Sequence, residues 1–380
     1  MFKYNEVTTL HLELTDKCNA NCPMCPRSLN GAFLNPNLRL TELTLENIKA
    51  ILPIDFIQQL QFVYLCGNFG DPIMACDTYE ILSYFREVNS NIKLAMFSNA
   101  SARDSNWWGK LGKLLSRPGD FVRFSIDGLE DTNHLYRQNT KWSRIMTNAK
   151  SYIAAGGVAF WDYLVFEHNY HQIEQASCLA KDLGFKEFYT KYSSRFVNDS
   201  GKLTIESFPV YNDQGIFQRV LRPLPENYLD HKFSDKKFPE QIYPVSRNQI
   251  IPWSPDPRSS EYSASFLKEC VSCQAKDNHE IYISSEGFVL PCCWTAFAIR
   301  STIEAEHINQ LRGYVLDQGL DTFSIFKNSL QTIIESNFFQ KTLVEGWQQT
   351  DPKSGQIMLC QKFCGKSSLV KKEFSNSKIL

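Results

Sequence analysis

The sequence lacks the features that would assign it to a membrane, to secretion or to a polyanionic partner. No run of about 18 apolar residues, the length that spans a membrane, occurs in it. The N-terminal segment has no basic region followed by an apolar region and a cleavage site. The 40 Lys and Arg residues balance 41 Asp and Glu residues, so a net charge of -1 provides no field that would attract nucleic acid. We therefore expect a cytoplasmic protein without a membrane or nucleic-acid partner.

The sequence also lacks internal repeats and low-complexity tracts. Hydrophobic residues make up 43% of its 380 residues and charged residues 21%, a composition that excludes wholesale disorder and supplies a sizeable core. The length excludes a single mini-domain. It fits one large domain, or a domain of about 200–250 residues with a smaller companion.

Cysteine, by contrast, is abundant, with 12 residues. In a chain without a secretion signal, this number argues against a disulfide framework and makes metal binding the default explanation. The early group is Cys18, Cys22 and Cys25, and the late group is Cys270, Cys273, Cys292, Cys293, Cys360 and Cys364. We expect the isolated Cys66, Cys76 and Cys178 to pack as small apolar side chains.

The first half of the chain alternates strand-like and helix-like segments. Runs of β-branched and aromatic residues predict six strands, at 8–14, 61–65, 92–97, 121–126, 158–166 and 186–192. Apolar spacing near 3 and 4 predicts five helices between them, at 44–52, 77–88, 105–115, 142–155 and 171–183. Asp77 and Glu80 have the form of a capping box. Because such alternation is typical of parallel strands with helices outside, we predict an α/β fold with a partial (β/α)6 barrel over residues 1–195.

The second half is less regular. Eight of the chain's 16 prolines fall between 196 and 262 without clean periodicity, which predicts an irregular, proline-rich bridge. Segments 280–284 and 288–290 flank Gly287 and predict a β-hairpin, since glycine supplies the positive φ that such turns need. Helical patterns follow at 303–316 and 321–337. We assign 263–380 to a small α+β domain.

The early cysteines have the spacing C-x3-C-x2-C directly after a predicted strand. Soft thiolates select zinc or iron–sulfur clusters, but structural zinc takes four ligands. A [4Fe–4S] cluster held by three cysteines would leave one iron open to the amine and carboxylate of a small molecule. The loop leaves the carboxyl end of a barrel strand, where active sites gather. An iron–sulfur cluster on Cys18, Cys22 and Cys25 is therefore favoured, with zinc as the alternative.

This arrangement resembles the radical S-adenosylmethionine (AdoMet) superfamily. The resemblance implies that a [4Fe–4S] cluster holds AdoMet and that a flavodoxin- or ferredoxin-type donor supplies one electron. A 5′-deoxyadenosyl radical then abstracts a hydrogen from the substrate, while the protein binds, orients and excludes water. One departure is Met24, where family members often carry an aromatic residue.

A turn after the second strand also resembles the family. Segment 67–72, which contains Asn68, Phe69, Gly70 and Asp71, is similar to the glycine-rich "GGEP" turn that meets the amino group of AdoMet. An aspartate stands where the usual residue is glutamate. Glycine suits close backbone approach to a ligand, because no side chain fits there. An ordinary strand-to-helix turn is the alternative.

Three further residues are assigned to AdoMet by resemblance. Asn99 lies in a segment similar to the family's strand-three end, and Ser125 in one similar to its strand-four end, from where it would reach the ribose hydroxyls. Arg137 falls where related enzymes place an arginine for the AdoMet carboxylate, which a guanidinium can bind with two hydrogen bonds. A solvated surface charge is the alternative for Arg137.

The late cysteines resemble the start of the SPASM and twitch auxiliary-cluster domains. Cys270 and Cys273 are followed by Gly287 and Cys292 at the family's spacing, and the hairpin turn at the glycine would fold Cys292 back toward the other two. Either Cys360 or Cys364 would complete the ligand set, with Cys364 favoured. The resemblance implies one auxiliary [4Fe–4S] cluster, and a zinc site is the alternative.

Cys293 follows the implied ligand Cys292 directly. Related sulfatase-maturing enzymes carry there an aspartate that takes a proton from the substrate radical. A thiol near a cluster and a basic group can have a lowered pKa, so we predict that Cys293 is a catalytic base or a transient ligand. Burial as a small apolar side chain is the alternative.

These resemblances imply a radical AdoMet oxidoreductase. We expect a small-molecule substrate, because the sequence leaves no room before Cys18 for a peptide-recognition domain. Modification of a peptide or protein side chain is the alternative. An iron–sulfur electron carrier or scaffold is the non-enzymatic alternative.

Overall fold

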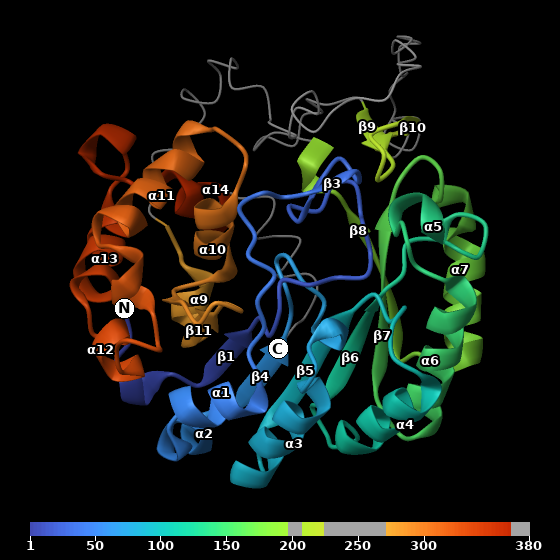
Figure 1. Ribbon diagram of the computed structural model, residues 1–380, viewed down its shortest axis with the longest axis horizontal. Coiled ribbons are helices and arrows are strands. Elements are labelled where there is room, and N and C mark those ends of the chain that lie inside the picture. Colours follow the sequence, from blue (N-terminus) through green and yellow to red (C-terminus); the bar gives the residue numbers. More distant parts are fainter. Residues whose placement is uncertain (197–206, 224–270, 366–380) are drawn as a thin grey trace.

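The computed structural model describes residues 1–196, 207–223 and 271–365. Their main sheet has eight strands in the order β12-β11-β1-β4-β5-β6-β7-β8, and helices α1 to α7 lie along its outer side (Figure 1). Its strands are β1 (Thr9–Leu12), β4 (Phe62–Leu65), β5 (Lys93–Ser98), β6 (Phe121–Ser125), β7 (Ala159–Val165), β8 (Glu187–Tyr192), β11 (Glu280–Ile283) and β12 (Val289–Leu290).

Strands β1, β4, β5, β6, β7 and β8 are parallel to their neighbours, and each overlaps one of the six predicted strands. The intervening helices are α1 (Leu45–Ile51), α2 (Ile54–Gln59), α3 (Thr78–Val88), α4 (Ser105–Leu114), α5 (Asn133–Tyr136), α6 (Trp142–Ala154) and α7 (Ile173–Leu183). The sequence did not predict the short α2 and α5. The predicted α/β class with a partial (β/α)6 barrel is confirmed.

Alternation along the strands divides the sheet into two unlike faces. Leu10 of β1 and Val63 of β4 are fully buried and belong to the same hydrophobic core as Ile81 and Phe85 of α3. Successive side chains of a strand point to opposite faces, so the intervening positions, such as His11 of β1, face the barrel interior. The apolar residues of one face therefore pack against the helices, and polar residues of the other face line the barrel interior.

The predicted capping box at α3 is wrong, because the Asp77 side chain makes no hydrogen bond to its own helix. It accepts a hydrogen bond from the Leu45 amide at 2.9 Å instead, at the start of α1. Thr44 and Asn47 form the capping box of α1. The carboxylate thus satisfies an unpaired amide of the neighbouring helix and ties α1 to α3.

The predicted hairpin at 280–290 forms, and it extends the barrel sheet. β11 pairs in parallel with β1, with Leu10 opposite Ile281, and β12 pairs antiparallel with β11. Gly287 has a φ of 77° in the turn between them. The sequence did not predict that this hairpin would lie against β1.

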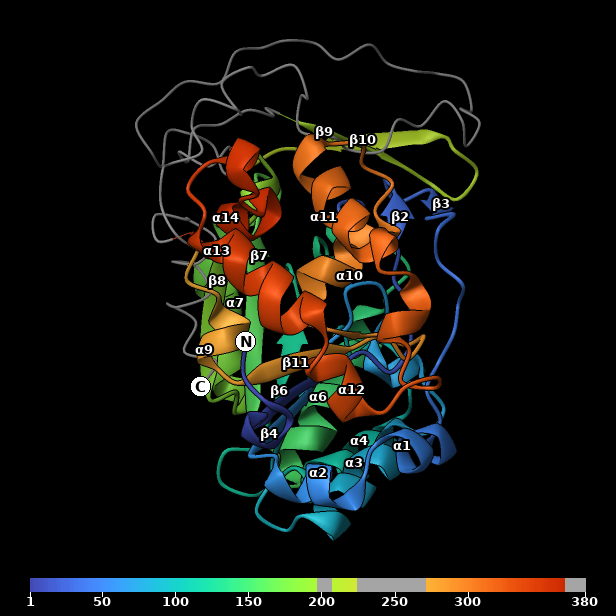
Figure 2. The ribbon, with the colours of Figure 1, turned by 90° about the vertical axis from the view of Figure 1, so that its left-hand side faces the viewer.

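Helices of the C-terminal segment gather beside β11 (Figure 2). They are α9 (Gln274–Asp277), α10 (Cys293–Arg300), α11 (Glu306–Asp317), α12 (Leu330–Ile334), a π-helix (Phe338–Thr342), α13 (Leu343–Gln348) and α14 (Met358–Cys364). The predicted helix at 303–316 corresponds to α11. The helix predicted at 321–337 is wrong in extent, because Ser324 forms a β-bridge with Phe288 and Ser329 caps the separate α12.

Part of the predicted irregular bridge is ordered. Strands β9 (Phe208–Tyr211) and β10 (Phe217–Leu221) form an antiparallel hairpin. Its apolar side chains, Phe208 and Leu221 among them, pack with Cys22 and Met24 of the cysteine loop in a small separate core. Among the described residues, β2 (Ser28–Leu29) and β3 (Phe33–Leu34) form a further hairpin within that loop. The expectation of an irregular segment is wrong for 208–221.

Gly112→Ala should destabilise the protein by about 1–3 kcal/mol, the usual cost of overpacking. A Cβ atom on Gly112 of α4 would lie 2.3 Å from the Tyr152 carbonyl oxygen of α6, which is backbone and cannot rotate away. Urea denaturation measures the change in the free energy of unfolding.

Gly313→Ala is the matched control for that substitution. Gly313 also lies within a helix, α11, but nothing is found within 4 Å of the position that its Cβ would take. Alanine should therefore stabilise the helix there by about 0.5–1 kcal/mol. Equal changes in unfolding free energy for the two substitutions would contradict the close packing of α4 on α6 at Gly112.

Candidate functional site

The three early cysteines lie in the loop that follows β1, at the carboxyl end of the parallel strands. The loop is held by its own hydrogen bonds. The Ser28 hydroxyl donates to the Cys22 carbonyl at 2.8 Å, and the Cys25 amide donates to the same carbonyl at 3.1 Å. The Asn21 side chain donates to the Gly31 carbonyl at 2.7 Å. These hydrogen bonds fix the conformation of the loop on both sides of Cys22.

A cavity of about 250 Å³ adjoins this loop. Every residue that the sequence assigned to the first cluster or to AdoMet lines it, namely Cys18, Cys22, Cys25, Asn68, Phe69, Gly70, Asp71, Asn99, Ser125 and Arg137. Five segments far apart in the sequence supply these residues. Their individual roles stay predictions, but the fold brings all ten to one cavity.

The glycines of the turn after β4 are required by contacts within the protein. A Cβ atom on Gly70 would lie 1.8 Å from the Thr15 carbonyl oxygen, and one on Gly67 would lie 2.2 Å from the Gly70 carbonyl oxygen. We had expected close approach to a ligand to select glycine here. Backbone packing against the start of the cysteine loop already excludes any side chain.

Asp71 joins this turn to two other walls of the cavity. Its amide donates to the Lys17 carbonyl at 2.9 Å, directly before Cys18. Its buried carboxylate accepts the Asn99 amide at 2.8 Å, and the Asn99 side chain reaches the Cys18 sulfur at 3.7 Å. Burial raises the pKa of Asp71, while the hydrogen bond from Asn99 opposes that rise. The aspartate therefore organises the cavity wall through hydrogen bonds to backbone.

Arg137 is held at the cavity by an ion pair. Its Nε donates to Asp127 Oδ2 at 2.5 Å, and its Nη1 lies 3.8 Å from the Cys22 sulfur. The side chain is 20% exposed, so the alternative of a solvated surface charge is wrong. Burial acts to lower the pKa of Arg137, but Asp127 and Cys22 raise it by more, so the pKa lies above its usual value. Arg137 therefore presents a permanent cation beside the cysteines.

Two of the early thiols, Cys18 and Cys22, have raised pKa values. Burial raises the pKa of Cys18, and nearby Asp71 adds to the effect. Burial also raises the pKa of Cys22 to about 11, although Arg137 acts in the opposite direction. Ligation by these thiols would therefore release protons. Three soft sulfur donors lining one cavity fit a [4Fe–4S] cluster with three protein ligands.

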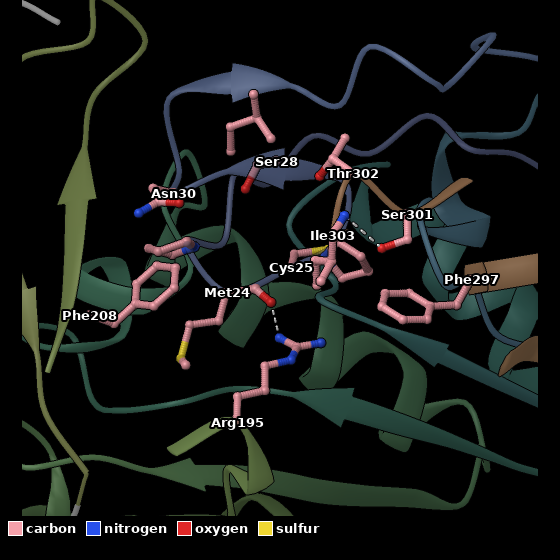
Figure 3. A pocket seen from close by; sticks show the side chains of 13 residues that line it. Met24, Cys25, Ser28, Asn30, Arg195, Phe208, Phe297, Ser301, Thr302 and Ile303 are labelled. Carbon is pink, nitrogen blue, oxygen red and sulfur yellow. Dashed lines mark hydrogen bonds between the residues drawn. The ribbon is translucent and has the colours of Figure 1, made fainter. Parts of the chain in front are cut away.

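A smaller cavity of about 60 Å³ adjoins the first across Cys25 and Arg195, which line both (Figure 3). Phe208 of β9 and Phe297 of α10 supply apolar walls. The Arg195 guanidinium donates a hydrogen bond to the Met24 carbonyl. Met24 is thus packed by the β9–β10 hairpin and held through its backbone carbonyl.

The late cysteines form a second site. Four of them, Cys273, Cys292, Cys360 and Cys364, line one small cavity of about 20 Å³. Cys270 lies outside the described residues. The hairpin β11–β12 carries Cys292 back toward Cys273, as expected from the turn at Gly287, and α14 brings both Cys360 and Cys364. The sequence had offered the last two as alternatives, and both reach the cavity.

The described cysteines of the two groups do not converge on one point. The ligands of a single zinc ion all lie about 2–2.3 Å from a common point. Within residues 1–196, 207–223 and 271–365, no three His, Cys, Asp or Glu side chains converge in this way. Zinc stays the alternative at both groups.

Cys293 lies in an acidic environment. Burial raises its pKa well above the usual value, and Cys292, Glu280 and Cys66 raise it further. The expected lowering of its pKa by a basic group is therefore wrong. Its backbone carbonyl accepts a hydrogen bond from the Asn68 side chain at 2.6 Å, which links the two cysteine sites. Its catalytic role stays a prediction.

The sequence missed a group of buried and half-buried polar residues inside the barrel. Glu280 accepts a hydrogen bond from the Tyr64 hydroxyl at 2.9 Å, and Tyr282 donates to Glu13. Burial raises the pKa of each carboxyl group to about 7. A glutamate that alternates with leucines or isoleucines in a strand is ordinarily read as facing water. In a barrel that position faces the interior, and an acidic residue between apolar neighbours, as at Glu13, was the available signal.

Glu280→Gln should make the free energy of unfolding less sensitive to pH. Burial raises the pKa of Glu280 from 4.5 to about 7, so the folded protein keeps a proton that the unfolded chain releases. The resulting stabilisation is complete below pH 4.5 and is lost as the pH rises through 7. Between pH 5 and 8 the wild type should lose roughly 2 kcal/mol more than the variant. Urea denaturation at several pH values tests this.

Glu87→Gln, at an exposed position of α3, provides the control. It also removes a carboxylate charge, but from an exposed side chain. The dependence of its unfolding free energy on pH should therefore follow that of the wild type. In Glu280→Gln the amide oxygen of the introduced side chain can still accept from Tyr64, which limits the structural disturbance. Parallel pH profiles for the wild type and Glu280→Gln would contradict the raised pKa.

No protein-family model matches the chain, and no curated protein matches it. Solved structures do. SuiB of Streptococcus suis is 15% identical, with 94% of this chain and 73% of SuiB covered and a TM-score of 0.53. SuiB bound to its precursor peptide SuiA is 14% identical, with 95% of this chain and 73% of SuiB covered and a TM-score of 0.53. Native anSMEcpe with bound AdoMet and the Cp18Cys peptide is 13% identical, with 97% of this chain and 94% of anSMEcpe covered and a TM-score of 0.51.

At these identities the similarity is one of fold. SuiB and anSMEcpe are radical AdoMet enzymes, and the alignment extends over nearly the whole of this chain. The match therefore includes the C-terminal segment as well as the barrel. The fold predicted from the strand–helix alternation and from the resemblance at the cysteine motif is confirmed, and the chain has the fold of the radical AdoMet enzymes.

Proposed function

We propose that this protein is a radical AdoMet enzyme. The observation that carries the proposal is the cavity of about 250 Å³, which three cysteines share with the seven residues assigned to AdoMet. When bound, a [4Fe–4S] cluster and AdoMet would supply a 5′-deoxyadenosyl radical that abstracts hydrogen from a substrate. The electron would come from a donor of the flavodoxin or ferredoxin type.

The chain's own residues would bind and orient the cofactors. Cys18, Cys22 and Cys25 would hold the cluster. The cationic Arg137, which Asp127 keeps in place at 2.5 Å, would attract the AdoMet carboxylate. The turn at 67–72 would present backbone groups to the AdoMet amine. Burial of these groups strengthens each interaction, because less water screens it.

We propose an auxiliary [4Fe–4S] cluster at the second cysteine site. The shared cavity of Cys273, Cys292, Cys360 and Cys364 supports these four as its ligands. Four thiolates are the number that fully ligates such a cluster. Cys270, the further ligand that the resemblance implies, lies outside the described residues.

For the substrate, we propose hydrogen abstraction from a small molecule, which makes the protein an oxidoreductase. Modification of a peptide is the second candidate, because SuiB and anSMEcpe have been solved with peptides bound and share this fold. An electron carrier is the third candidate, but it has no use for a cavity beside the cysteine loop. No helix within the described residues could cross a membrane, and we propose a cytoplasmic location.

The triple substitution of Cys18, Cys22 and Cys25 by Ala should leave roughly half of the iron and abolish AdoMet cleavage. Wild-type protein reconstituted without oxygen should hold about 8 Fe, four for each of two clusters. Iron analysis and the formation of 5′-deoxyadenosine after reduction measure the two effects. Unchanged iron in the variant, or zinc in the wild type, contradicts the proposal.

Single substitutions can separate the auxiliary ligands. Cys360→Ser and Cys364→Ser should each lower the iron bound at the second site, whereas AdoMet cleavage should continue at the first. Cys178→Ser, at an exposed cysteine of α7, is the matched control. Cys270→Ser decides between the two ligand sets: retention of about 8 Fe supports Cys273, Cys292, Cys360 and Cys364, and loss of half the iron supports Cys270 as a ligand, as the resemblance implies.

A further inference from the structure

A carboxylate outside the 67–72 turn determines the position of that turn. Glu13 directly follows β1 and is 2% exposed. Its Oε1 accepts the Phe69 amide at 2.8 Å and the Gly70 amide at 3.1 Å. Its Oε2 accepts the hydroxyl of Tyr282, a residue of β11 in the C-terminal hairpin. Three donors from two segments therefore converge on one carboxylate.

The turn has little freedom to move without disturbing the cysteine loop. Gly70 packs against the backbone at Thr15, where a Cβ atom would lie 1.8 Å from a carbonyl oxygen. The next amide, of Asp71, donates to the Lys17 carbonyl at 2.9 Å. Lys17 precedes Cys18. Any displacement of the turn is thus transmitted to the first ligand of the cysteine loop.

Removal of Glu13 would leave unpaired groups in a buried place. The Phe69 and Gly70 amides would lose their acceptor, and buried amides without a partner are costly. The chain would then move the turn to find water or another acceptor. Asn68, in the same turn, is already tied to the C-terminal segment through the Cys293 carbonyl at 2.6 Å.

We propose that Glu13 is a positioning residue of the AdoMet site and that Tyr282 makes the C-terminal hairpin a structural part of that site. This inference rests on the proposed function. Glu13 acts through the turn and does not line the cavity of about 250 Å³ itself. The auxiliary segment therefore contributes to cofactor binding through a hydrogen bond as well as through its own cysteines.

The test measures AdoMet affinity in the full-length, reconstituted and reduced protein. The EPR spectrum of the reduced cluster is followed during an AdoMet titration. Glu13→Ala should weaken AdoMet binding about 10- to 100-fold, the range for lost hydrogen bonds to a charged group. Glu13→Gln should restore affinity to within about threefold, because an amide oxygen can accept both backbone amides. Iron content should stay at the wild-type value in both variants.

Tyr282→Phe tests the contribution of the hairpin and should weaken AdoMet binding by about 3- to 10-fold. Two matched controls remove equivalent groups elsewhere. Asp120→Asn alters a buried carboxylate that accepts a hydrogen bond from the Leu94 amide at 2.8 Å and pairs with Arg86, and Tyr152→Phe removes a hydroxyl bonded to the Val158 carbonyl at 3.3 Å. Neither control should change AdoMet affinity.

A second readout does not depend on AdoMet. Hydrogen exchange at the Phe69 and Gly70 amides should be faster in Glu13→Ala and in Tyr282→Phe than in the wild type. If the wild type fails to bind AdoMet, the proposed function is wrong, while exchange still reports on the turn. Wild-type affinity in Glu13→Ala overturns the positioning role. If that variant does not fold, wild-type affinity and wild-type exchange in Tyr282→Phe overturn it instead.

Discussion

The geometry of the first cysteine site depends on the close contact between the backbones at Gly70 and Thr15. No side chain fits between them, since a Cβ atom would lie 1.8 Å from the Thr15 carbonyl oxygen. The contact places the end of β4 against the end of β1. Asp71 then extends it to β5 through the Asn99 amide. Three neighbouring strand ends are thereby fixed relative to Cys18, which follows the contact by three residues.

The barrel interior shows how the protein tolerates polar groups away from water. Asp162 of β7 pairs with Lys191 of β8 at 2.7 Å and lies 3.4 Å from the Arg123 guanidinium. Glu13 and Glu280 each have a tyrosine hydroxyl as a partner. A buried charge is costly unless it is paired and hydrogen-bonded. The apolar face toward the helices supplies stability, and the interior face is free to carry chemistry.

Local patterns in the sequence predicted much of the fold and the lining of the first cavity. The six strands followed from periodicity, and the residues from Cys18 to Arg137 followed from the cysteine spacing and from the family resemblance that it implied. Interactions between distant segments were not predictable in this way. The pairing of β11 with β1, the cap that Asp77 gives to α1, and the acceptor role of Glu13 each join residues far apart in sequence. The expected pKa of Cys293 was wrong for the same reason, because Glu280 of β11 and Cys66 after β4, which raise it, lie far from Cys293 in the sequence.

The pairing of β1 with β11 has a consequence for folding. Leu10 lies opposite Ile281, so the paired residues are 271 positions apart (281 minus 10). Closing so long a loop is entropically costly, and contacts of high sequence separation slow folding. During synthesis β1 can pair with β4 long before its other partner leaves the ribosome. One edge of β1 must therefore stay open until most of the chain has been made, and the first cysteine loop acquires its final surroundings only at that late stage.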